Sequence, residues 1–349
     1  MKKVVVKVGS SIIAPQGKIQ PQLIAALVQD ILEAQKQGCQ IILVSSGAIA
    51  SGADCLNLAR KPTDVHSLMA LASLGQIVLM EAYSKAFQRH GRFCGQILLS
   101  WDDFDSRKRF LNARQTIDKL LALGIVPIIN ENDAVSDEEI KFGDNDRLSA
   151  LTADLAGAGQ LIILSDVEGL LDERKQVIPR VEKIDDKVYG LVRKKAGAFT
   201  SGGMSTKLEA ARICTHAGIT MVIAKGKERG VVPRIIVGES IGTLFLPKAK
   251  IDSAKKRWIA FSKKAKGRLY IDDGARDAIL ERGKSLLCVG IIKVEGEFKK
   301  KDSVQVLDQD GNLVGAGLVN YSAQELISCG RAKLAKEVIH RDSFAKHYL

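Results

Sequence analysis

Short apolar runs rich in β-branched residues alternate with longer helical patterns along the first 250 residues of this 349-residue chain. Several runs are apolar at consecutive positions, which is typical of strands buried on both faces of a parallel sheet. The predicted strands are 3–8, 40–45, 93–100, 125–130, 161–165 and 220–224. The alternation predicts an α/β fold, with helices covering both faces of a mainly parallel sheet.

Four segments between or after these strands have helical patterns. They are 21–37, 62–89, 107–123 and 204–216. The first begins with Pro21 and ends before Gly38, a start and a stop that are common in helices. Ligands bind at the carboxyl ends of the strands in such folds, so the loops that follow the strands are where we expect the chemistry.

The pattern changes after residue 250. Residues 250–349 hold 20 basic and 13 acidic residues, a net charge of +7, within a total of +12. We interpret residues 1–250 as a first domain and the basic stretch 251–266 as a linker. Short strands then predict a small β-rich domain, 267–349, with a hairpin turn at Asp310-Gly311. Excess positive charge is typical of a solvated surface or of a domain that binds polyanions.

Neither the cysteines nor the N-terminus indicates secretion. The six cysteines are scattered without a C-x-x-C pair, which argues against a disulfide framework or a zinc site and fits a reducing compartment. Lys7 interrupts the first valine run, and no stretch approaches about 20 apolar residues. We expect a cytoplasmic protein without a membrane segment. The five histidines show no metal spacing, so no protein metal site is expected.

Two loops rich in small residues follow the first two predicted strands. Lys7 is a charge inside an otherwise apolar strand, which is costly without a partner or an anionic ligand. Gly9 and Ser10 follow it and offer backbone N–H groups to an anion. After the second strand, Ser46 and Gly47 lie in a run of small residues that lets the backbone approach a ligand closely.

Polar residues follow the predicted strand 125–130. The sequence reads Asn-Glu-Asn-Asp at 130–133 and Gly-Asp-Asn-Asp at 143–146. Asp or Asn side chains can accept hydrogen bonds from a substrate amine, and a carboxylate can orient lysines through charge-assisted hydrogen bonds. A solvated loop is the simpler interpretation of this segment taken alone.

A glycine- and hydroxyl-rich segment opens the helix predicted at 204–216. Its residues are Ser201, Gly202, Gly203, Met204, Ser205, Thr206 and Lys207. It is not a Walker A loop, yet a helix N-terminus with a lysine can hold phosphate oxygens in the same way. Ser165 and Asp166 end another strand and can add contacts to a nucleotide. Together, these loops suit phosphoryl transfer, which depends on positioning and charge neutralisation.

Seven segments in order resemble the glutamate 5-kinase family of the amino-acid kinase superfamily: VVVKVGSS, SSGAIASG, RFLNARQT, VPIINENDAV, KFGDNDRLSA, LSDVEGL and SGGMSTK. The tail from about residue 267 resembles a PUA domain. This resemblance implies a three-layer α/β/α kinase domain. It also implies transfer of phosphate from ATP, with Mg²⁺ held mainly by the nucleotide, to L-glutamate, giving L-glutamyl 5-phosphate in the first step of proline synthesis.

The resemblance also implies residue roles. Lys7, Asp146 and Lys207 match the catalytic positions. The glutamate-binding positions match Ser46, Gly47, Asp133 and Asn145. The ATP-binding positions match Lys7, Gly9, Ser10, Ser165, Asp166 and the segment Ser201 to Lys207. Feedback inhibition by L-proline and a homo-oligomer, dimer or tetramer, are further implications. The chain departs from the family after Gly169, where the TxDP turn is missing, and at Ser201, where the family has threonine.

Three other interpretations remain open at this point. Another carboxylate or carbamate kinase of the same fold would use the same lysines with a different acceptor. An RNA-binding protein would use the basic tail, although it leaves the four loops unexplained and lacks RNP-type aromatic motifs. A regulatory pseudokinase is disfavoured, because Lys7, Asp146 and Lys207 are all present.

Overall fold

The computed structural model describes residues 1–58, 60–136, 145–193, 203–248, 252–330, 332 and 334–347. The chain divides into two compact units, Met1–Ile251 and Asp252–Leu349. Each unit has its own sheet and its own core of buried aliphatic side chains.

The sheet of the first unit has the strand order β3-β4-β2-β1-β5-β7-β8-β6 in the described part of the chain. The described strand pairs are parallel except for the antiparallel pair β7–β8. Each strand predicted from an apolar run is present, within two residues at either end. The strands are β1 (Lys2–Val8), β2 (Cys39–Ser45), β3 (Cys94–Leu99), β4 (Val126–Glu131), β5 (Gln160–Ser165), β6 (Arg180–Val181), β7 (Thr220–Lys225) and β8 (Thr243–Phe245).

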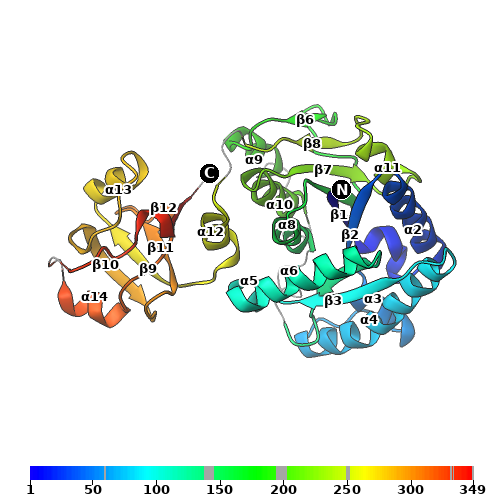
Figure 1. Ribbon diagram of the computed structural model, residues 1–349, viewed down its shortest axis with the longest axis horizontal. Helices are drawn as coiled ribbons and strands as arrows, with labels where there is room; N and C mark the ends of the chain where they lie inside the picture. The colour runs from blue at the N-terminus through cyan, green and yellow to red at the C-terminus, as the bar shows by residue number, and fades with distance from the viewer. Residues whose placement is uncertain are drawn as a thin grey trace. The chain divides into compact units, whose positions relative to one another are not determined.

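Helices cover both faces of this sheet, which confirms the predicted three-layer architecture (Figure 1). One face packs against α2 (Pro21–Lys36), α4 (Val65–Gln88) and α11 (Val231–Ile236), and the other against α6 (Arg107–Ala122), α8 (Asn145–Ala156) and α10 (Met204–His216). Among the described residues of the unit, the other helices are α1 (Ser10–Ile13), the 3-10 turn η1 (Pro15–Gly17), α3 (Ala48–Cys55), α5 (Trp101–Asp105) and α9 (Asp186–Arg193).

The helix predicted at 62–89 begins three residues later than expected. Asp64 is its N-cap, and the Asp64 carboxylate accepts a hydrogen bond from the Ser67 backbone N–H at 2.8 Å. An N-cap residue has extended backbone angles, so the residues before it lie outside the helix. The capping hydrogen bond also lowers the pKa of Asp64.

Strand β1 lies at the centre of the sheet, between β2 and β5. The chain passes from β1 to β2 and the strands beyond it, and then returns to place β5 on the other side of β1. Loops that leave neighbouring strands in opposite directions open a crevice at the carboxyl ends of those strands. The Gly9 N–H donates to the Leu164 carbonyl at 3.2 Å across this point, so the ends of β1 and β5 meet at the crevice.

Helices α3 and α4 pack backbone to backbone. A Cβ atom on Gly75 would overlap the Ala48 carbonyl oxygen, and one on Gly52 would overlap the Leu71 carbonyl oxygen. Glycine at both positions lets the two helices approach this closely. The contact fixes the part of α4 that carries Gln76 against the loop after β2.

Helix α4 is the one helix in the described part of the chain that is long and apolar enough to cross a membrane. Its face with Leu68, Leu79, Tyr83 and Phe87 is buried within the first unit. A core helix of a folded domain satisfies the same criteria of length and composition, so these criteria are weak evidence for a membrane span.

The second unit contains a five-stranded sheet with the order β10-β9-β11-β12-β13 in its described residues. Its strands are β9 (Ala265–Ile271), β10 (Ile291–Gly296), β11 (Ser303–Leu307), β12 (Leu313–Leu318) and β13 (Phe344–Lys346). Its longer helices are α13 (Asp273–Leu280) and α14 (Ala323–Cys329), and its 3-10 turns are η3 (Cys288–Gly290) and η4 (Arg341–Ser343). Strands β11 and β12 form the predicted hairpin, with Gly311 at φ 84° in its turn.

One prediction for the second unit was wrong in detail. The stretch expected as a linker is folded in its described residues, as α12 (Ala254–Arg257) and a π-helical turn, η2 (Trp258–Ser262). Ile259 and Phe261 of this turn are buried, and η2 packs on β12 and β13. Strand β10 begins at Ile291, directly after the 3-10 turn η3.

Candidate active site

Three charged side chains from distant segments meet beneath the crevice. Lys7 Nζ lies 2.7 Å from Asp146 Oδ1, and Lys207 Nζ lies 3.0 Å from Asp146 Oδ2. The two lysines are 4% exposed and Asp146 is fully buried. The structure therefore brings together the three residues that the sequence predicted as catalytic. Lys207 is buried against Asp146.

The local fold explains why these charges are tolerated. Lys7 lies between Val6 and Val8, which pack into the core on the α2 face, so alternation along β1 directs Lys7 to the opposite face. Asp146 lies in the first turn of α8, where the helix dipole favours a negative charge. The Thr206 hydroxyl donates to Asp146 Oδ2 at 3.1 Å. A charge can be buried without a large loss of stability only when such partners surround it.

The loop after β1 lies directly beside this cluster. A Cβ atom added to Gly9 would lie 4.0 Å from Lys7 Nζ. Ser10 begins α1 and is exposed. At the end of β5, the Ser165 hydroxyl donates to the Asp166 carboxylate at 3.0 Å. The residues predicted for nucleotide binding at these two strand ends therefore lie at adjoining positions on one edge of the sheet.

The glycine-rich segment leads into α10. Gly203 is the N-cap residue, and Met204, Ser205, Thr206 and Lys207 form the first turn. The predicted positions Ser201 and Gly202 lie outside the described residues. The N-terminus of this 13-residue helix and Lys207 thus belong to the same turn, the arrangement that the sequence predicted for holding phosphate oxygens.

A chain of side-chain amides extends from Asp146 away from the lysines. Asn145 Nδ2 lies 2.9 Å from Ser46 Oγ and 2.8 Å from Asn130 Oδ1. Asn130 Nδ2 donates to Gln76 Oε1 at 2.8 Å. The sequence prediction included Ser46 and Asn145. It placed Asn130 in the polar segment 130–133 without a role of its own. It missed Gln76, for which the one available signal was a polar residue inside an apolar helical run.

A pocket of about 250 Å³ opens beside this chain, and Gln76, Asn132 and Asp133 line it together with Ala48 and residues of β3. Asp133 is 6% exposed, and burial raises its carboxyl pKa to about 7, although the charge of Lys61 lowers it. Among the described residues, Asp133 Oδ1, Asn145 Oδ1 and Gln76 Nε2 are buried without a hydrogen-bond partner. Buried polar atoms without partners are rare in folded proteins, so these atoms are suited to bind a ligand.

Gly47 makes the turn from β2 into α3. Its φ of 107° lies in the left-handed region, and a Cβ atom there would lie 3.4 Å from Ile13 Cδ1. Glycine is therefore required at this position by the backbone, which holds Ser46 beside Asn145.

The segment after Gly169, which lacks the TxDP turn, folds as a compact hairpin-like turn. Leu171 pairs with Val177, and Asp172 accepts a hydrogen bond from the Gln176 N–H at 2.8 Å. Lys175 has a φ of 63°, a left-handed conformation that turns the chain. A local turn whose sequence differs from TxDP therefore closes this loop.

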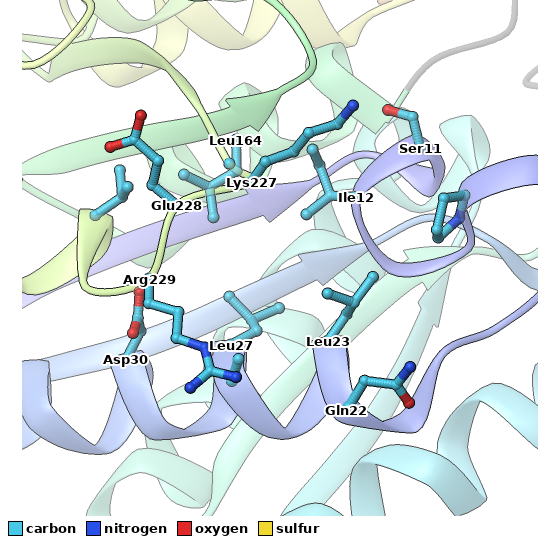
Figure 2. Close-up of a pocket in the computed structure, with 14 residues that line it drawn as sticks. Ser11, Ile12, Gln22, Leu23, Leu27, Asp30, Leu164, Lys227, Glu228 and Arg229 are labelled. Atoms are coloured by element: carbon cyan, nitrogen blue, oxygen red, sulfur yellow. The ribbon is translucent and has the colours of Figure 1, made fainter.

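A second pocket, of about 280 Å³, lies between α2 and the loop after β7 (Figure 2). Lys227 extends along it toward Ser11, while Asp30 and Arg229 lie at the other end. Its apolar lining includes Ile12, Leu27 and Leu164, which belong to the core on the α2 face. The second pocket is therefore on the face opposite to Lys7 and Asp146.

A parallel α/β sandwich with two buried lysines on one carboxylate, a helix N-terminus and a pocket lined by amides defines a class of protein, the phosphotransferases that act on small acids. The family model for "Amino acid kinase family" matches residues 2–225, and the model for "PUA domain" matches residues 267–341. The chain belongs to the amino acid kinase family, and it is similar over nearly its full length to glutamate 5-kinases.

Those relatives match both units of the chain. Glutamate 5-kinase from Syntrophotalea carbinolica is 43% identical over 360 residues, covering 98% of this chain and 96% of the relative. Glutamate 5-kinase from Methylococcus capsulatus is 42% identical over the same coverage. Among solved structures, carbamate kinase from Giardia lamblia bound to AMP-PNP aligns with a TM-score of 0.50 at 18% identity, covering 71% of this chain and 99% of that one. This last similarity concerns the fold alone.

Proposed function

We propose that the chain transfers the γ-phosphoryl group of ATP to the side-chain carboxylate of L-glutamate, the first step of proline synthesis. The observation that carries this proposal is the contact of Lys7 and Lys207 with the two oxygens of Asp146, next to the pocket of unpartnered amide and carboxylate atoms. The identity of the glutamate 5-kinase relatives over 98% of the chain supports it.

In this mechanism a glutamate carboxylate oxygen attacks the γ-phosphorus and forms the new P–O bond. The bond between the γ-phosphorus and the bridging oxygen breaks, and ADP leaves with its electron pair. No proton transfer and no protein nucleophile are needed. Lys7 and Lys207 neutralise charge on the transferring group, and Asp146 holds both ammonium groups in position.

The nucleotide half of the site comprises the ends of β1 and β5 and the first turn of α10. Backbone N–H groups near Gly9 and Ser10 and at the α10 N-terminus hold phosphate oxygens, and Ser165 and Asp166 contact the nucleotide. The resemblance to the family extends this role to Ser201 and Gly202.

Mg²⁺ is the metal that fits this reaction, because it prefers phosphate oxygens and water together with few protein carboxylates. Both oxygens of Asp146 contact ammonium groups, so this carboxylate suits orienting the lysines rather than binding the metal. Held by the nucleotide phosphates, Mg²⁺ would supply charge neutralisation there.

The acceptor half comprises Ser46, Gly47, Asp133 and Asn145. Asp133 and the Asn145 carbonyl are hydrogen-bond acceptors and match the ammonium group of an amino acid. This favours glutamate over carbamate, the main alternative acceptor, because carbamate has no separate ammonium group to satisfy both. ADP release measured with glutamate, aspartate, N-acetylglutamate and carbamate tests the assignment, and a preference for any acceptor other than glutamate contradicts it.

The resemblance to the family supports three further proposals, on regulation, assembly and location. L-proline inhibits the reaction, the chain forms a homo-oligomer, a dimer or a tetramer, and the enzyme works in the cytoplasm. The apolar pattern of α4 is accounted for by its buried face in the first unit.

The second unit binds RNA weakly and without sequence specificity. The match to a PUA domain and the net charge of +7 over residues 250–349 support this proposal. Phosphate contacts release counterions, so the affinity should fall steeply between about 50 and 200 mM salt. An affinity for structured RNA that barely changes over this range contradicts electrostatic binding.

A further inference from the structure

We infer that Gln76 of α4 is a specificity-determining residue that donates a hydrogen bond from Nε2 to the α-carboxylate of L-glutamate. The inference rests on the proposed function, because it concerns how the acceptor is held. It adds a residue from the middle of α4, a helix that is not part of the four loops that carry the predicted site.

The hydrogen-bond chain fixes which way each amide faces. Asn145 Nδ2 lies near the Ser45 carbonyl, Ser46 Oγ and Asn130 Oδ1, so Asn145 Oδ1 is left as an acceptor. Asn130 Oδ1 also accepts from the Glu131 N–H, so Asn130 Nδ2 faces Gln76 Oε1. Amide orientation is assigned by such networks, and here each amide constrains the next. Gln76 Nε2 is therefore a donor.

This donor is buried and unsatisfied within the described part of the chain. Gln76 is 8% exposed, and its Nε2 has no hydrogen-bond partner there. Leaving a buried donor unpaired is unfavourable, and a ligand that accepts a hydrogen bond from it removes this penalty. Gln76 lines the 250 Å³ pocket together with Asp133. The close contact of Gly75 with Ala48 holds α4 in place, so Gln76 cannot withdraw from the pocket without separating α3 from α4.

The order of the chain indicates which end of the substrate Gln76 contacts. Asp146 holds the two lysines, and Asn145 precedes it in the sequence. The Asn145 side chain contacts Asn130, and Asn130 contacts Gln76. The phosphoryl acceptor must lie at the lysines, so Gln76 lies toward the far end of glutamate. There Asp133 supplies an acceptor for the ammonium group and Gln76 a donor for the carboxylate, the two charges that an α-amino acid presents.

Gln76→Glu is the sharpest test, because it keeps the oxygen that accepts from Asn130 and replaces only the donor with a second oxygen. At pH 8 we expect KM for L-glutamate to rise roughly 10–100-fold, as for loss of a hydrogen bond to a charged group, with KM for ATP unchanged. Gln76→Met removes the donor without adding charge and should raise KM for glutamate about tenfold. Gln88→Glu, the same change at an exposed position on the same helix, is the matched control and should leave KM unchanged.

A second acceptor separates this role from a purely structural one. 4-Aminobutyrate has the amine and the reacting carboxylate of glutamate but no α-carboxylate. In the unmodified protein, kcat/KM should be higher for glutamate than for 4-aminobutyrate. Both Gln76 variants should lose most of this difference. If folded Gln76→Glu protein keeps the normal KM for glutamate, or if the preference over 4-aminobutyrate persists in both variants, the inference is wrong. If the unmodified protein shows no glutamate-dependent ADP release, the proposed function itself fails.

Discussion

Lys7 and Lys207 contact opposite oxygens of the same buried carboxylate, although one lies on the central strand and the other in the first turn of α10. Asp146 thereby sets the separation and direction of two ammonium groups. The three side chains together carry one positive charge, and an anionic phosphoryl group beside them would be stabilised in a site of low dielectric constant.

Replacement of Lys207 by methionine should lower kcat by roughly 10²–10³-fold, the usual effect of removing one charge partner of the transition state. Methionine has a similar length and fills the buried space, so the fold should persist. The measurement is kcat at saturating ATP and glutamate, with the melting temperature as a check on folding. Lys36→Met removes an exposed lysine paired with Glu33 and should leave kcat unchanged. Near-normal turnover by folded Lys207→Met protein would refute the catalytic role.

Replacement of Asp133 by asparagine or of Asn145 by alanine should raise KM for glutamate about tenfold or more and leave KM for ATP nearly unchanged. Both residues belong to the acceptor half of the site, where the Asn145 side chain contacts Ser46 and Asn130. Initial rates with each substrate varied in turn give the two constants. Equal effects on both substrates would show that the halves of the site are assigned wrongly.

The pKa of Asp133, about 7, predicts two pH effects. Protonation removes the charge that binds the substrate ammonium group, so KM for glutamate should rise as the pH falls below 7. Because the folded pKa is above the ordinary value of 3.8, the proton bound by Asp133 stabilises the fold at low pH, and this stability is lost as the pH rises from about 4 through 7. Asp133→Asn should therefore raise the melting temperature more at pH 8 than at pH 5. A pH-independent difference would contradict the assigned pKa.

The sequence predicted the layers and the buried charge of Lys7 for a physical reason. Strands buried on both faces read as unbroken apolar runs, so Lys7 was conspicuous within one. Gln76 was not, because α4 is apolar around much of its circumference and one polar residue does not reveal where it points. The basic residues at 255–257 and 263–264 concealed the buried Ile259 and Phe261, so a folded turn was taken for a linker. Contacts between segments distant in the sequence determine which of these residues are buried and where their side chains point, and a local sequence pattern does not show such contacts.

Replacement of Gly75 by alanine should destabilise the first unit, because the added Cβ would overlap the Ala48 carbonyl oxygen. Overpacking of this kind costs about 3 kcal/mol, or roughly 6–12 °C in melting temperature for a unit of this size. KM for glutamate should rise as well, since Gln76 follows directly. Gly190→Ala is the control, because a Cβ there meets no atom within 4 Å. An unchanged melting temperature in Gly75→Ala would show that the helices separate at little cost.

L-Proline should inhibit competitively or in a mixed manner against glutamate. It shares the α-carboxylate and the charged nitrogen of glutamate, so it can occupy the end of the pocket formed by Asp133 and Gln76. Asp133→Asn should then weaken inhibition by proline along with glutamate binding. Titration of proline at low glutamate concentration tests this, and no inhibition at millimolar proline would refute it for this protein.

A protein truncated after Ile251 should fold and keep its kinase activity. Each unit has its own core, and every described residue of the candidate site lies in the first unit. The cut preserves the hydrogen bond from the Lys248 N–H to the Thr215 carbonyl at 3.0 Å, which holds the end of α10, the helix that carries Lys207. A cut after Leu246 removes that bond and should lower both the melting temperature and kcat. Circular dichroism melts and ADP release compare the two truncated proteins with the full chain. If the longer one has a native spectrum but no turnover, the kinase reaction depends on the second unit, and the independence of the two units is refuted.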